Sequence, residues 1–470
     1  MSARQQIVLG VALALAACAE FTPDGGMAPI ASAARTQLGA VPVKITSAEE
    51  AQRARQAVQD LLRDPVSADT AVRIALINNR DLQAAFNNLG LAETASVAAG
   101  IPPNPRFSVS RVAGAGIVEW EMRLATDILS LATLPARRDI AKLGFAHAQQ
   151  AAISTTYRTA LEARRAWIMA VAAHQIVREM EEARAAAAAT AELMRRLGET
   201  GGATQLEQAR AGAALAEIGA QLARARLTER TARERLVRAL GLWDQAAVLR
   251  LPDRLPTLPR QPERSDNAEA DAVTQRTDLV MARMEVTQAA RGLDLTETTR
   301  FVSALELAGL GKLESEKGIP LNRGGLELEI ELPIFDGGEI KLRRETETYM
   351  LALNRLAAKS VAVRSEARVA REAYLGAHAI ALQYQRTVLP LRRIIAKETL
   401  LRYNGMLADV FDLLTEARER VAARIAATEA QRDFFLAEAD LRAAIIVGGM
   451  TPIANTIPTT AQAPAAGGPH

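Results

Sequence analysis

Four short segments of the sequence alternate apolar and polar residues with a period of two. The apolar side chains fall on one face of each predicted strand, and the other face carries carboxylates at Glu119, Glu121, Glu327, Glu329 and Glu331. Alternation over about ten residues is typical of a β-strand with lipid on one side and water on the other. We therefore predict strands over Arg106–Val112, Val118–Leu124, Phe301–Leu307 and Leu326–Leu332.

One such segment alone fits an amphipathic strand of a soluble sheet better than a membrane strand. Four strands are also too few to close a barrel, and lipid cannot satisfy the unpaired backbone groups of an open sheet edge. Several chains must then contribute four strands each, and three chains give twelve, which is a feasible closed barrel. After the N-terminal segment no stretch approaches 18 uninterrupted apolar residues, so we expect no transmembrane helix there.

Very long helical stretches follow each pair of predicted strands. No proline occurs between Ala136 and Leu251, and the segment is rich in Ala, Leu, Arg and Glu, which are strong helix formers. A helix over Leu134–Arg196 would be roughly 90 Å long, and one over Glu339–Arg402 would be similar. Pro390 lies inside the second helix and is expected to kink it. The predicted fold class is a mixed α/β membrane protein, mainly α, in which helical hairpins continue a sheet.

The order of predicted elements occurs twice: a short helix, two strands, then a long hairpin with a Gly-rich turn. A repeat of about 200 residues is a duplicated domain, because solenoid repeats are much shorter. The turn Leu197–Gly202 aligns with Leu401–Met406, and Thr204–Glu207 is a capping box that starts the return helix. Glycine and asparagine tolerate a left-handed backbone, which predicts the hairpin-tip turns at Gly198, Gly201, Gly202, Asn404 and Gly405.

The N-terminus has the features of a secretory signal. Arg4 precedes the apolar segment Ile7–Leu15, which is too short to span a bilayer, and the small residues Ala16 and Ala17 follow it. Cys18 is the one cysteine of the 470 residues, so it has no disulfide partner within the chain. The alternatives are an ordinary signal peptide with a chance cysteine and a bacterial lipobox, in which Cys18 would become an acylated N-terminus; we favour the second.

Composition argues against nucleic acid as a partner. Lys and Arg number 57 against 54 Asp and Glu, and the arginines alternate with glutamates along the predicted helices. Such mixed charge is typical of a solvated helical face. The chemistry of a catalytic or metal site is also missing from the sequence, because His147, His174, His378 and His470 are scattered and no phosphate loop or nucleophile elbow occurs. We expect no enzyme activity, cofactor or metal site.

Three motifs resemble the TolC-type outer-membrane efflux factors, in their lipoprotein branch. They are Ala75–Leu82, the run Leu332–Gly338 that leads into the second long helix, and Leu389-Pro390 followed by Tyr403-Asn404-Gly405. The similarity covers about residues 67–449. It implies a homotrimer with a 12-stranded outer-membrane β-barrel that continues into a periplasmic helical tunnel. It also implies docking to a periplasmic adaptor and an inner-membrane pump, for passive export of small molecules or cations.

The resemblance also bears on the N-terminus and on the ends of the chain. Ala19 in place of Asp favours the outer membrane, where acyl chains such as palmitate would anchor Cys18 in lipid. A lipid-anchored periplasmic adaptor or coiled-coil scaffold without a barrel is the alternative, but it would carry one hairpin rather than two. We expect a signal peptide over 1–17, a lipidated segment over 18–66, repeats over 67–241 and 268–449, a Pro-rich linker over 242–267 and a disordered tail over 450–470.

An acidic cluster follows the second hairpin turn. Its members are spaced three, four and three residues apart, opposite an apolar stripe of the coiled-coil kind, at Asp409, Asp412, Glu416 and Glu419. Repeated in a trimer, these carboxylates would form rings that favour cations and could close the periplasmic end of the channel. Two alternatives stay open: Asp409 caps a helix and the rest form a solvated face, or Val410 and Leu414 form the constriction.

Overall fold

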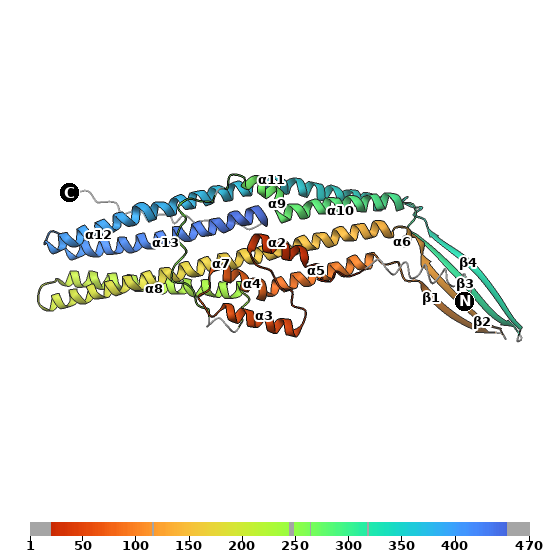
Figure 1. Cartoon of the computed structure of the whole chain (residues 1–470), viewed down its shortest axis with the longest axis horizontal. Helices are drawn as coiled ribbons and strands as arrows, with labels where there is room; N and C mark the ends of the chain where they lie inside the picture. Colours follow the sequence, from red (N-terminus) through yellow and green to blue (C-terminus); the bar gives the residue numbers. More distant parts are fainter. Residues whose placement is uncertain (1–19, 115–116, 244–248, 264, 317–318, 449–470) are drawn as a thin grey trace.

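The computed structural model describes residues 20–114, 117–243, 249–263, 265–316 and 319–448. The chain is an elongated body with a four-stranded sheet at one end and the tips of two helical hairpins at the other (Figure 1). The predicted signal peptide, Cys18 and the predicted tail over 450–470 lie outside the described residues. The predicted fold class, mainly helical with four antiparallel strands, is confirmed.

Both halves of the chain contain two helices, two strands and a long helical hairpin in the same order. The first half contains α2 (Ala28–Leu38), α3 (Ala48–Leu61), α4 (Ala68–Asn78), α5 (Arg80–Ala99), β1 (Arg106–Gly114), β2 (Ile117–Asp127), α6 (Ile128–Ala132), α7 (Leu134–Glu199) and α8 (Gln205–Ala239). The second half contains α9 (Ala268–Gln275), α10 (Thr277–Thr299), β3 (Ala304–Glu316), β4 (Ile319–Glu331), α11 (Glu339–Gln383), the π-helical turn η3 (Tyr384–Val388), α12 (Leu389–Asn404) and α13 (Val410–Ile446). The first half has α2, α3 and α6 in addition.

The long helices begin and end close to the predicted positions. Helix α7 has 66 residues and carries a proline in its first turn. Proline is tolerated there because an N–H in the first turn has no acceptor within the helix. In the second half the helix passes through Pro390 without ending. Since Pro390 cannot donate to the carbonyl four residues earlier, the chain forms the π-helical turn η3 immediately before it. The expected irregularity at Pro390 therefore takes the form of a π turn.

The sheet joins the two halves of the chain. Its order is β1-β2-β3-β4, all antiparallel, and the pairing of β2 with β3 places Trp120 opposite Leu313. The predicted boundaries of the last two strands were wrong at both ends: β3 begins after Phe301 and extends to Glu316, and β4 begins at Ile319 and ends before Leu332. Both strands continue through glycines, whose missing side chains hide the alternation in the sequence, at Gly309, Gly311, Gly324 and Gly325.

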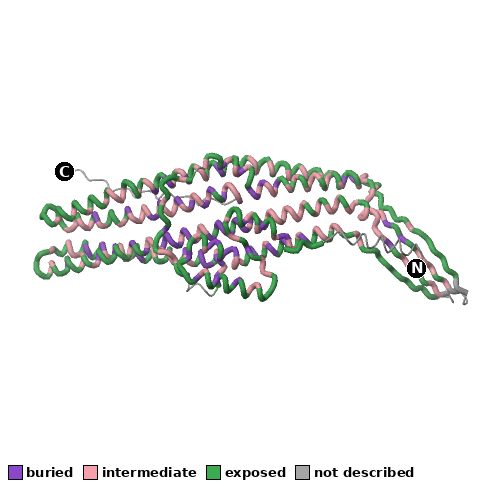
Figure 2. Tube along the Cα trace, viewed as in Figure 1, coloured by how far each residue is buried: buried purple, intermediate pink, exposed green. Residues whose placement is uncertain are grey.

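The core lies at the waist, where α7 packs against α4, α5 and α8, and Figure 2 shows buried residues concentrated there. Trp167 is buried in this core and donates its indole N–H to the carbonyl of Val66 at 2.6 Å. The N-terminal segment is tied to α5 by Glu93, a buried carboxylate that accepts hydrogen bonds from the backbone and side chain of Thr22. Many of the buried residues along α7 are alanines, which allow close helix packing.

The Pro-rich linker between the two halves is fastened to both hairpins by its backbone. The Leu255 N–H donates to Gln175 of α7 at 3.1 Å. Farther along, the Pro259 carbonyl bonds the ring of His378 on α11 at 2.9 Å, and the Glu263 N–H donates to the Tyr374 hydroxyl at 2.9 Å. His378 and Tyr374 both pack against the ring of Phe434 on α13. The linker is therefore a clasp that holds the helices together.

No helix in the described part of the chain is both long enough and apolar enough to cross a membrane.

Candidate functional site

One face of the sheet carries charged residues on all four strands. Residues directly opposite each other in neighbouring strands share a face, and the register places the five predicted glutamates on one face. The same face carries further carboxylates and four cationic side chains at Glu306, Glu314, Arg106, Arg123, Lys312 and Arg323. The face is therefore charged but not uniformly acidic.

Several of these charges are paired across strands. Arg123 on β2 lies 2.6 Å from Glu306, 3.1 Å from Glu327 and 3.4 Å from Glu329. Lys312 forms an ion pair with Glu119. Lys312 and Arg323 were missed in the sequence because they lie in the glycine-containing parts of β3 and β4, where no strand was predicted. The carboxylates on this face outnumber the four basic residues, so negative charge is in excess.

The opposite face of the sheet is apolar and exposed. It carries Phe107 and Val109 of β1, Trp120 of β2 and Leu328 of β4, with fractional exposures of 66%, 49%, 42% and 60%. Arg111 lies beside them and places its guanidinium 5.7 Å from the centroid of the Trp120 ring. In water such a continuous apolar surface would be unfavourable, because apolar side chains gain free energy when they leave water. The arrangement fits a sheet with lipid on this face.

The first hairpin tip has the predicted glycine turn. Gly201 has a φ of 78°, in the left-handed region, and the Gly202 N–H donates to the Leu197 carbonyl at 2.7 Å. Gly198 lies in the last turn of α7, where a Cβ would overlap the side chain of Gln208. The return helix begins with the predicted capping box. Hydrogen bonds from the backbone and side chain of Thr204 lower the pKa of Glu207.

The second hairpin tip differs from its prediction. Asn404 is the last residue of α12, and Gly405 has a φ of −84°, so neither adopts the left-handed conformation. Met406 does, with a φ of 59°. The Leu407 N–H donates to the Arg402 carbonyl at 2.8 Å, as Gly202 does to Leu197 in the first tip. The second turn therefore matches the first turn with a shift of one residue from the alignment made by sequence. The hydrogen bonds of the helix end place the left-handed backbone at Met406 and not at the neighbouring Gly405.

Asp409 and Asp412 cap helix α13. The Asp412 N–H donates to the Asp409 carboxylate at 2.8 Å, and the Asp409 N–H donates to the Asp412 carboxylate at 3.1 Å. This reciprocal arrangement is a capping box with aspartates in both positions. The helix-cap interpretation of Asp409 is therefore what the structure shows. Both side chains are exposed, with Val410 half-buried beside them.

The other two acidic residues of the cluster face the partner helix of their own hairpin. Glu416 is buried rather than solvated, and its carboxylate lies 3.6 Å from Arg392 of α12. Arg392 also forms an ion pair with Glu419. Leu414 lies on the same helix and is half-buried. The role of Arg392 was missed in the sequence, because it lies more than 20 residues before Glu416 and Glu419 and forms no local pattern with them. The folding of the hairpin brings Arg392 next to the two glutamates.

Ion pairs also tie the two hairpins to each other near the tips. Arg418 of α13 lies 2.8 Å from Glu217 of α8, and Arg424 of α13 lies 2.9 Å from Glu182 of α7. Closer to the tip, the guanidinium of Arg210 on α8 lies 5.4 Å from the centroid of the Phe411 ring. These contacts fix the position of α13 against the first hairpin.

Two of the histidines have acidic partners that sequence spacing does not reveal. His147 of α7 lies 3.1 Å from Glu285 of α10, and His174 lies 2.7 Å from Glu229 of α8. Each pair joins two helices and has the form of a structural contact. Among the described residues, no group of three or more His, Cys, Asp or Glu side chains is arranged to hold a metal ion.

The chain is similar in structure to solved bacterial membrane proteins. Campylobacter jejuni CmeC, an outer-membrane channel, has a TM-score of 0.69 and 17% identity over 80% of this chain and 85% of its own. VceC, an outer-membrane protein of Vibrio cholerae, has a TM-score of 0.67 and 16% identity over 85% and 98%. CusC, a protein that folds to form a transmembrane channel, has a TM-score of 0.67 and 15% identity over 81% of this chain and 92% of its own.

Comparison by sequence gives no match, either to a family model or to a curated protein. At these levels of identity the structures establish the fold and leave the activity to be inferred from the site. The expected resemblance to the TolC-type proteins is confirmed at that level: this chain has the fold of the outer-membrane channels.

Proposed function

We propose that this chain is the outer-membrane channel of a tripartite efflux system, of the TolC type, and that it conducts small molecules or cations passively from the periplasm to the exterior. The observation that carries this proposal is the two-faced sheet at the end of the helical hairpins. Its apolar face suits lipid, and its charged face suits a water-filled lumen. The excess of carboxylates on the lumen face, which includes Glu121 and Glu331, supports a preference for cations.

The channel would be a homotrimer. Strands β1 and β4 lie at the two edges of the sheet, and within the described part of the single chain each lacks a partner strand on one side. Lipid does not tolerate such edges, so each must pair with the sheet of a neighbouring copy, and three copies close a 12-stranded barrel. Apolar side chains exposed along α11 and α12 support the same assembly; they include Val361, Val369, Ile394 and Leu401.

The hairpin tips would dock a periplasmic adaptor, which links the channel to an inner-membrane pump. Met406 and Leu407 are 94% and 81% exposed at the second tip, which supports a protein partner there. We propose that the same tip narrows the channel. Asp409 and Asp412, already engaged in capping, would add negative charge to the rim, and the ion pairs of Arg418 and Arg424 would hold the hairpin in place.

A membrane-extracted sample tests the channel assignment. The unheated protein is expected to migrate on an SDS gel as a compact species distinct from the boiled chain, because closed barrels resist SDS. The purified protein should also form discrete conductance steps in planar bilayers. A protein that runs as a monomer without heating, is extracted from the inner membrane and gives no conductance would be an anchored adaptor or scaffold instead.

The N-terminal anchor is a separate proposal that rests on the lipobox around Cys18. Replacing Cys18 with serine should abolish acylation and leave either uncleaved precursor or unlipidated protein. Insertion of the barrel should survive in part, because twelve strands bury far more apolar surface than acyl chains do. Labelling cells with radioactive palmitate provides the measurement. Equal incorporation of label into Cys18→Ser and wild-type protein would show that Cys18 is not the lipidation site.

A further inference from the structure

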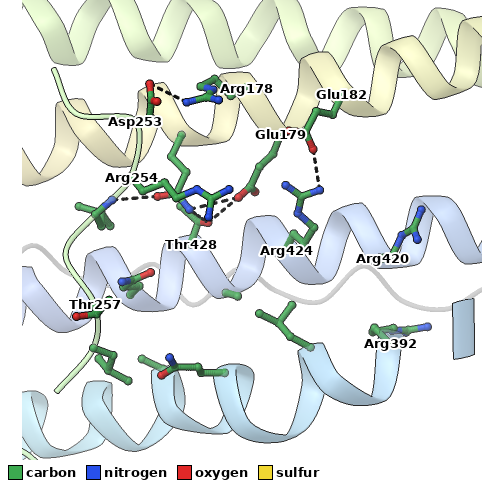
Figure 3. Close-up of a pocket in the computed structure, with 18 of the residues that line it drawn as sticks. Arg178, Glu179, Glu182, Asp253, Arg254, Thr257, Arg392, Arg420, Arg424 and Thr428 are labelled. Carbon is green, nitrogen blue, oxygen red and sulfur yellow. Dashed lines mark hydrogen bonds and ion pairs between the residues drawn. The ribbon is translucent and has the colours of Figure 1, made fainter. Parts of the chain in front are cut away.

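A cavity of about 750 Å³ lies between the two hairpins at the level of the linker (Figure 3). Helix α7 and linker residues 253–258 form one side, and η3, α12 and α13 form the other. A volume of this size matches pockets that bind small organic molecules. Gln385 of η3 and Leu389 line it as well. A ligand there would touch the π-helical turn, a feature that is frequent at functional sites.

Arginines dominate the charge of the cavity. Six arginines line it, against three acidic residues. Two of the three acids are already paired, Asp253 with Arg178 at 2.7 Å and Glu182 with Arg424 at 2.9 Å. Arg392, a third arginine, pairs with glutamates of α13. The remaining three arginines have no ion pair within the described ranges; they are Arg254, Arg393 and Arg420.

These three arginines come from three different elements. Arg254 belongs to the linker, Arg393 to α12 and Arg420 to α13. Figure 3 shows Arg254 at the end of the cavity that the linker closes, and Arg420 at the other end, beside Arg392. Guanidinium groups bind carboxylate and phosphate oxygens through paired N–H donors. Three such groups around one cavity therefore suit an anion with more than one negative oxygen group.

The buried carboxylate of Glu179 adds a second feature that a ligand of this cavity should match. Glu179 lines the cavity and is 8% exposed. One of its oxygens accepts hydrogen bonds from Gln175 and Thr428, at 3.3 and 3.2 Å. Its other oxygen, Oε2, is buried and has no hydrogen-bond partner among the described residues. Because a buried polar atom without a partner is unfavourable, a ligand that donates an O–H group to this oxygen would be stabilised.

We propose that this cavity binds a hydroxylated oxyanion, a sugar phosphate or a hydroxycarboxylate, with its anionic groups on Arg393 and Arg420 and a hydroxyl group on Glu179. The two ligand classes share the chemistry that the cavity offers: negative oxygen atoms and an O–H donor on one small molecule. The site does not depend on the proposed channel function, since binding is measured on the purified chain whatever the protein exports.

Calorimetric titration of the full-length protein in detergent tests the site, with glucose 6-phosphate and citrate as probes and NaCl to match ionic strength. Saturable binding is expected for at least one probe, and the probe that binds tells phosphate from carboxylate. The variant Arg393→Gln/Arg420→Gln should bind at least about tenfold more weakly. Each charge-assisted hydrogen bond that is lost weakens binding by roughly severalfold.

The matched control is Arg35→Gln/Arg55→Gln, which removes the same charge from exposed positions on α2 and α3. It should bind as the wild type does. A readout on the unmodified protein uses hydroxyphenylglyoxal, which labels arginine: bound probe should protect Arg393 and Arg420 and leave Arg35 and Arg55 reactive. Absence of saturable binding for both probes, equal weakening in the control, or equal protection of all four arginines would overturn the proposal.

Discussion

Replacing Val109 with arginine is expected to prevent assembly of the membrane-inserted barrel. Val109 lies near the middle of β1 on the apolar face, opposite Met122. An arginine on the lipid face near the bilayer midplane is unfavourable by about 2–4 kcal/mol, and a trimer would carry three of them. The measurement is the fraction of membrane protein that keeps its heat-modifiable migration, together with the urea midpoint of unfolding in liposomes. Both should fall strongly.

The neighbouring residue provides the control. Ser110 lies on the same strand at nearly the same depth, but on the charged face, opposite Glu121. Ser110→Arg introduces the same side chain into the proposed lumen, beside a carboxylate, and should assemble like the wild type. Equal behaviour of the two variants, in either direction, would show that this sheet does not separate lipid from water.

Reversing the acidic partners of the inter-hairpin ion pairs is expected to open the tip. In Glu182→Arg/Glu217→Arg, each new arginine faces Arg424 or Arg418, which now repels it. These pairs are about half exposed, so each is worth only about 0.5 kcal/mol. Two pairs in each of three chains nevertheless sum to roughly 3 kcal/mol, which shifts the balance between closed and open tips about a hundredfold. Single-channel conductance in planar bilayers should rise severalfold.

A charge swap separates lost attraction from general damage. Adding Arg418→Glu and Arg424→Glu to the reversed variant restores two opposite-charge pairs with inverted polarity, and conductance should return toward the wild-type value. If the swapped and reversed variants conduct alike, the ion pairs do not hold the tip closed. The constriction would then depend on the apolar positions Val410 and Leu414.

The sequence was most informative where a pattern is regular over many residues. The long helices were predicted to within a few residues, since α7 has no proline beyond its first turn and strong helix formers throughout. The strands were located where glutamate alternates with leucine, as in the second half of β4. Their glycine-containing halves were missed, because pairing with the neighbouring strand rather than side-chain alternation defines them there.

The candidate site was less accessible to sequence reasoning, because its contacts join residues far apart in the chain. Glu416 was predicted either in a ring of carboxylates at the channel end or on a solvated face, yet Arg392 and the packing of the hairpin bury it. The left-handed tip residue was expected at Asn404 or Gly405 and is Met406. Residue type predicts where a left-handed backbone is tolerated, but the hydrogen bonds of the helix end determine which residue adopts it.

The clasp formed by the Pro-rich linker changes where this chain can be cut or extended. By composition, the linker has the appearance of a domain boundary, the usual place for insertion or circular permutation. Here the backbone groups of Leu255, Pro259 and Glu263 are bonded to helices of both halves. An inserted sequence would separate groups that hold the hairpins side by side, whereas the exposed turn at Gly201 has room to grow. The fold therefore accepts tags, fluorophores and permuted termini at the first hairpin tip, where a bulky insertion would also block the proposed docking of the adaptor.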